Sequence, residues 1–116
     1  MISTRFDNPE YWVTAQGEVI TIEDLETSHI LNIMAMFERK PTLIQTLLIK
    51  DIASTRVWTP IKNDYKLSMS NITSMSIQEL KDYWYGSELY QAMRNELLNR
   101  GVNVDQMMIN FKEEEQ

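Results

Sequence analysis

Two helix boundaries lie back to back near the end of the chain, at Gly86 and Ser87. Ser76 opens an S-x-x-E capping box, which starts a helix that Gly86 can end in a left-handed conformation. Ser87 then serves as the N-cap of the next helix. Helices over residues 77–85 and 88–100 with so short a link must meet at a tight corner. The chain is therefore expected to pack short helices against one another.

An earlier helix is predicted over residues 28–40, because apolar side chains recur there at helical spacing. The stripe consists of Ile30, Ile33, Met34 and Phe37. Thr27 or Ser28 can act as the N-cap, and Pro41 ends the helix because proline cannot continue it.

A second apolar segment follows Pro41 directly. Leu43 and Leu47 lie four residues apart, which favours a helix over residues 42–53. A buried strand over residues 43–49 stays open as the alternative, since short apolar runs fit both structures.

The remaining segments give weaker signals. Residues 55–59 suit a strand or an ordered loop, and the polar stretch 68–74 is typical of a connection. Residues 104–111 suggest a short closing helix with Asp105 as its cap. Residues 112–116 form an acidic tail.

Residues 10–22 are typical of a β-hairpin. Trp12 and Ile20 lie in segments rich in strand-forming residues, and Gly17 between them can adopt the positive φ of a turn. An isolated hairpin is marginally stable in water, so this one must pack on the helices. The expected fold is α+β: an N-terminal two-stranded hairpin against three to four α-helices, as one domain over 1–116.

Composition excludes several classes of protein. The 116 residues are 43% hydrophobic, which is enough for a core, and no apolar stretch is long enough for a membrane span. There is no cysteine, which excludes disulfides and thiolate metal sites. The net charge of −6 argues against binding to duplex nucleic acid.

Catalytic and metal-binding motifs are missing from the sequence. His29 is the single histidine, so neither a metal site with paired histidines nor a catalytic triad can be assembled around it in a known pattern. Three dispersed glycines form no phosphate-binding loop. We therefore expect no enzymatic activity, no metal and no cofactor.

Aromatic and arginine residues suggest binding instead. Aromatic rings can stack on bases, and guanidinium groups can hold phosphates. The candidate ligand contacts are Trp12, His29, Asn32, Arg39, Arg94 and Arg100. The same residue types form hot spots between proteins and also cap small cores. Because the tryptophan and tyrosine content is high for a small core, a homo-oligomer is also expected.

Three short motifs resemble those of small accessory proteins of bacteriophages. Those proteins combine a W-x-T-x-x-G hairpin, an H-L-x-N helix and a closing E-L-x-x-R-G helix. The matching residues here are Trp12, Thr14 and Gly17, then His29, Ile30 and Asn32, then Glu96, Leu97, Arg100 and Gly101. Ile30 stands where leucine is usual. The resemblance implies an accessory protein that acts in the cytoplasm of the infected bacterial host.

Two functions are compatible with this resemblance. The first is a non-enzymatic protein that counters host immunity by binding, in its sharper form by sequestering a nucleotide second messenger. The alternative is an inhibitor or adaptor that binds a host defence protein or a phage protein.

Overall fold

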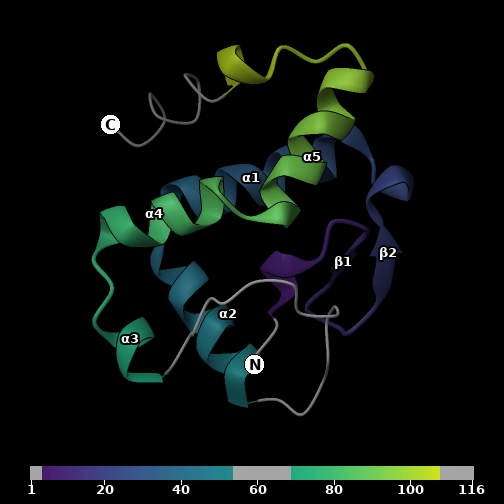
Figure 1. Cartoon of the computed structure of the whole chain (residues 1–116). Coiled ribbons are helices and arrows are strands. Elements are labelled where there is room, and N and C mark those ends of the chain that lie inside the picture. The colour runs from purple at the N-terminus through teal and green to yellow at the C-terminus, as the bar shows by residue number, and fades with distance from the viewer. Residues whose placement is uncertain (1–3, 54–68, 108–116) are drawn as a thin grey trace.

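The computed structural model describes residues 4–53 and 69–107, and it confirms an α+β fold with an N-terminal hairpin packed on helices (Figure 1). The elements, in order, are the 3-10 turn η1 (Arg5–Asp7), strands β1 (Tyr11–Val13) and β2 (Val19–Thr21), the 3-10 turn η2 (Ile22–Asp24), and helices α1 (Thr27–Arg39), α2 (Thr42–Ala53), α3 (Met69–Thr73), α4 (Ile77–Tyr85) and α5 (Glu88–Asn99). Among the described residues, no helix has the length and apolar content needed to cross a membrane.

The hairpin pairs antiparallel, with Trp12 opposite Ile20. Gly17 takes a φ of 85°, as the predicted turn requires. Trp12 points to the helices, and its ring meets Phe37 of α1 in an edge-to-face contact with centroids 6.1 Å apart. This aromatic contact is what anchors the otherwise marginal hairpin to the helical layer.

Helices α1 and α2 follow the predicted bounds closely. The whole predicted stripe of α1 is buried, and the helical alternative for α2 is correct, so the strand over 43–49 is wrong. The predicted caps of α1 are also wrong: Glu26 occupies the N-cap position and makes no capping bond. The hydroxyl of Thr27 instead accepts a hydrogen bond from Arg100, at 3.0 Å.

The corner between α4 and α5 is present, and its caps are mostly as predicted. The capping box of Ser76 is complete, and the Ser87 side chain accepts from the Tyr90 amide. Gly86, however, has right-handed angles of φ −84° and ψ −4°, so the left-handed prediction is wrong. The corner is made at Ser87 instead, whose extended backbone (φ −75°, ψ 150°) redirects the chain into α5.

The end of α5 carries the left-handed glycine instead. Gly101 has a φ of 81°, and its amide and that of Val102 bond to carbonyls in the last turn of α5, as in a Schellman motif. Asn103, not Asp105, caps the helical turn that begins at Val104, because its side chain accepts from the Gln106 amide.

The polar stretch 68–74 contains α3, so its assignment as a connection is wrong. The predictions for residues 55–59 and for the acidic tail 112–116 lie outside the described residues, as does the last part of the segment 104–111.

Aromatic side chains form the centre of the core. Phe37 lies between Phe6 and Trp84, with ring centroids 5.6 Å and 4.6 Å away. Tyr90 of α5 extends the cluster from Trp84, at 5.2 Å. Phe6 is fully buried, so the 3-10 turn η1 is an integral part of the core. Burying one such aromatic side chain contributes about 2–3 kcal/mol.

The turn η1 is closed by a capping box in which the Asp7 carboxylate accepts from the Thr4 amide, at 2.9 Å. Burial raises the pKa of Asp7 above its ordinary 3.8; the bonds from Thr4 oppose the shift, and the charge of Asp51 adds to it. The folded state therefore takes up this proton more readily than the unfolded state. The contribution of Asp7 to stability is lost as the pH rises above 3.8 through the raised pKa.

Replacing Asp7 with asparagine should remove this pH dependence while keeping an acceptor for the Thr4 amide. Urea denaturation at pH values on either side of the raised pKa measures the effect. The free energy of unfolding of the wild type, relative to that of Asp7→Asn, should be higher on the acidic side. A constant difference across this range would contradict the role of burial.

Candidate ligand-binding cavity

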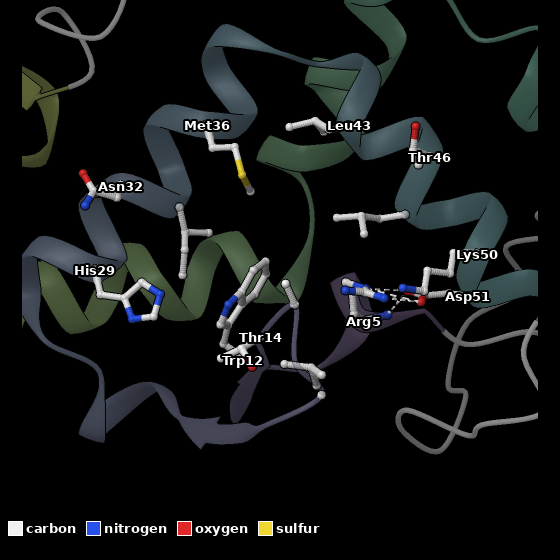
Figure 2. Close-up of a pocket in the computed structure, with 15 residues that line it drawn as sticks. Arg5, Trp12, Thr14, His29, Asn32, Met36, Leu43, Thr46, Lys50 and Asp51 are labelled. Atoms are coloured by element: carbon white, nitrogen blue, oxygen red, sulfur yellow. Dashed lines mark hydrogen bonds and ion pairs between the residues drawn. The ribbon is translucent and has the colours of Figure 1, made fainter.

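A cavity of about 640 Å³ lies between the hairpin and helices α1 and α2 (Figure 2). Its volume falls within the range of small-molecule sites, roughly 300–1,000 Å³. The lining residues are Arg5, Trp12, Val13, Thr14, Ala15, Gly17, His29, Asn32, Ile33, Met36, Leu43, Thr46, Leu47, Lys50 and Asp51. Three predicted contacts, Trp12, His29 and Asn32, are thus brought together at one site.

The middle of the cavity is apolar. Trp12 and Met36 face each other across it in Figure 2, and Leu43 and Leu47 of α2 complete the wall. Only 8% of the Trp12 surface is exposed, because its ring packs on Phe37. Trp12 therefore forms a floor that touches a ligand over a small area, and it offers less face for stacking than the sequence suggested.

His29 and Asn32 form one polar end of the cavity. They lie three residues apart on α1; in Figure 2 the His29 ring is directed toward the middle of the cavity, whereas the Asn32 amide points away from it. His29 is half-buried and Asn32 is exposed. Imidazole and amide groups can both donate and accept hydrogen bonds, so this end suits a neutral polar group of a ligand.

Arg5, Lys50 and Asp51 form the opposite end, which the sequence analysis did not predict (Figure 2). Arg5 donates from Nη2 to Oδ1 of Asp51 at 2.8 Å and from Nε to Oδ2 at 3.0 Å. Its backbone amide also donates to Oδ2, at 2.9 Å. The Asp51 side chain is 1% exposed, so the pair is buried, whereas Lys50 on the rim is exposed.

Two of the predicted arginines lie outside this cavity. Arg94 on α5 donates to the exposed Asp105 at 3.1 Å, and this hydrogen bond raises the pKa of Arg94. Arg39 is exposed in the last turn of α1 and does not line the cavity. Neither is placed to hold a ligand that contacts Trp12.

Arg100 also lies outside the cavity, and its guanidinium group is fully engaged within the chain. Its Nε donates to Glu96, and its two terminal nitrogens make four more bonds. Their acceptors are the carbonyls of Ile22, Glu23 and Leu25 and the hydroxyl of Thr27. An arginine has five N–H donors, and all five have acceptors here. Binding a phosphate would require Arg100 to release the loop before α1.

The cavity brings together apolar, hydroxyl, amide, imidazole and charged side chains. The cavity holds one histidine and no serine or cysteine nucleophile among its lining residues. Within residues 4–53 and 69–107, no three acidic or histidine side chains are grouped so that they could hold a metal ion. No family model, no curated protein and no solved structure matches the chain.

Proposed function

We propose that the protein is a non-enzymatic binding protein that captures a small molecule in the cavity between the hairpin, α1 and α2. The observation that supports this proposal most directly is that the cavity has an apolar middle and polar side chains at both ends. Such sites use apolar area for affinity and a few polar groups for orientation. Here Trp12 and Met36 supply the apolar area. The polar groups are those of His29, Asn32 and Lys50.

In its sharper form, the proposal is that the ligand is a nucleotide second messenger and that the protein is a phage accessory protein active in the host cytoplasm. Two features support this form. Trp12, His29 and Asn32, which belong to the motifs that resemble phage proteins, line one cavity. Lys50 adds a cation on the rim, and it could hold a phosphate, the role that was expected of the arginines. A base would lie along the apolar wall and a phosphate near Lys50.

Closing the mouth of the cavity should abolish ligand binding. Thr46 is exposed and lines the cavity, so a tryptophan there would enter the opening with little disturbance of the core. A bound ligand raises the melting temperature, because at a hundred times Kd it stabilises the folded state by about 2.7 kcal/mol. We expect a thermal-shift screen of nucleotide messengers to yield such a rise for the wild type and none for Thr46→Trp.

Thr42→Trp is the matched control. Thr42 lies one turn earlier on α2, is equally exposed and does not line the cavity. This variant should keep the thermal shift of the wild type. Equal shifts in the wild type and in both variants would place the ligand elsewhere, and a loss in both would point to damage to α2.

The alternative is a protein partner that inserts a side chain into the same opening. The observation in its favour is that the rim residues Asn32, Thr46 and Lys50 are all exposed. In that case Thr46→Trp would abolish capture of one defined partner, while no nucleotide would shift the melting temperature. Self-association stays a prediction: Val19, Ile77 and Leu98 are about half exposed, but they belong to three separate elements.

A further inference from the structure

The charges of the cavity set the charge of its ligand. Building on the proposed function, we infer that the ligand carries a single negative charge joined to an apolar or aromatic body, and that this charge lies at the Lys50 end. Among nucleotides, this describes a cyclic mononucleotide with one phosphodiester. Outside nucleotides, it describes an aliphatic or aromatic carboxylate.

Within residues 4–53 and 69–107, the ionisable groups that line the cavity are Arg5, His29, Lys50 and Asp51. Arg5 and Asp51 neutralise each other through a bidentate pair with distances of 2.8–3.3 Å. When histidine is counted as neutral, as in the formal net charge of the chain, the described lining residues keep one formal charge, the positive charge of Lys50. Asp7 lies close enough to Asp51 to influence it, but its carboxylate bonds to Thr4 and does not line the cavity.

One positive charge at this place contrasts with the protein as a whole, whose net charge is −6. An anion is repelled by the average surface and attracted at the Lys50 end. Opposite charges attract near a protein surface, although solvent screens the interaction at an exposed side chain such as Lys50. An anionic group is therefore favoured next to Lys50, and a cationic group there is disfavoured.

The apolar middle limits the number of charges. A ligand that reaches from the Lys50 end to His29 passes between Trp12 and Met36. A second negative charge would lie against these apolar side chains or beside His29 and Asn32, where the described part of the chain places no lysine or arginine of the lining. Removing an unpaired charge from water is costly, so ligands with two phosphates, such as cyclic dinucleotides, should bind more weakly than ligands with one.

Titration calorimetry with four probes tests the inference. Decanoate and decylammonium have the same chain length and opposite charge, and cyclic AMP and cyclic di-AMP have one and two negative charges. We expect decanoate, cyclic AMP or both to bind the full-length protein. Decanoate should bind at least about tenfold more tightly than decylammonium, and cyclic AMP at least about tenfold more tightly than cyclic di-AMP. A tenfold difference in Kd corresponds to about 1.4 kcal/mol. Comparison of decanoate with cyclic AMP separates the two sources of the anion.

Substitutions at Lys50 test whether the anionic group of the ligand binds next to this residue. Lys50→Gln should weaken binding of the anion about tenfold, and Lys50→Glu should reverse the preference within the decanoate pair. Lys40→Gln is the control, because Lys40 is exposed at the end of α1 and does not line the cavity. It should bind like the wild type.

The possible failures are distinguishable. If a probe binds and Thr46→Trp abolishes that binding, but decylammonium or cyclic di-AMP is preferred or Lys50→Gln has no effect, the single-anion inference is overturned and the binding function stands. If none of the four probes binds the wild type, the single-anion inference is overturned, and the small-molecule function is overturned as well only if the thermal-shift screen also yields no ligand that Thr46→Trp excludes.

Discussion

Replacing Asp51 with alanine is expected to lower the free energy of unfolding by about 3–5 kcal/mol, the usual effect of removing one partner of a buried ion pair. The Asp51 side chain is 1% exposed and that of Arg5 is 11% exposed. The carboxylate accepts from the Arg5 guanidinium and also from its backbone amide. Without the carboxylate, the nearly buried guanidinium loses its hydrogen bonds to Asp51, and the Arg5 backbone amide loses the one it donates there.

Urea denaturation followed by circular dichroism measures this loss. Asp82→Ala is the matched control, because Asp82 lies on the exposed surface of α4, where most substitutions change stability by less than about 0.5 kcal/mol. A loss below about 1 kcal/mol for Asp51→Ala would show that the pair is not buried in solution. The double variant Arg5→Met with Asp51→Leu should be more stable than either charge-deleting single variant, since an apolar pair leaves no unpaired charge.

Local signals explain how much of the fold could be predicted from the sequence. Helical spacing, the Ser76 capping box and Pro41 act over four residues or fewer, and each marks an element boundary to within one residue. The helix over 42–53 shows how one segment serves two purposes. Its buried Ile44 and Leu48 enter the core, while Leu43 and Leu47 line the cavity.

The parts that the sequence could not predict depend on contacts between distant residues. Arg5 and Asp51 are separated by 46 positions, and no periodicity connects them. Phe6 carries no helical or strand pattern, yet it is fully buried within the aromatic cluster. The Arg5–Asp51 end of the cavity was therefore missed. His29 and Asn32 were proposed because they belong to a short motif within one predicted helix, which is a local signal.

The arginines show that the residues of a binding site are also hard to predict when their partners lie far away in the sequence. An arginine in a sequence indicates a possible phosphate contact, but its real partners are set by the tertiary structure. For Arg100, four of the five acceptors lie 73–78 residues earlier in the chain, at the loop around η2 and the start of α1. For Arg94, the acceptor is a surface aspartate.

Arg100→Ala is expected to lower the free energy of unfolding by about 2–4 kcal/mol, because three carbonyls and one hydroxyl lose a charged donor at once. Arg100→Lys should recover less than half of this loss, since a single ammonium cannot reproduce the planar arrangement of five donors.

Arg94→Ala is the matched control on the same helix. Its partner Asp105 is 84% exposed, and such surface pairs contribute about 0–1 kcal/mol. The comparison separates the structural role of Arg100 from the ligand contact expected from the sequence. If Arg100 were a ligand contact, the free energy of unfolding of Arg100→Ala, measured without ligand, would be close to that of the wild type. The substitution would lower the affinity for the ligand instead. A structural anchor gives a large loss of stability without any ligand, and because Arg100 does not line the cavity, the folded fraction of the variant should still bind what the wild type binds.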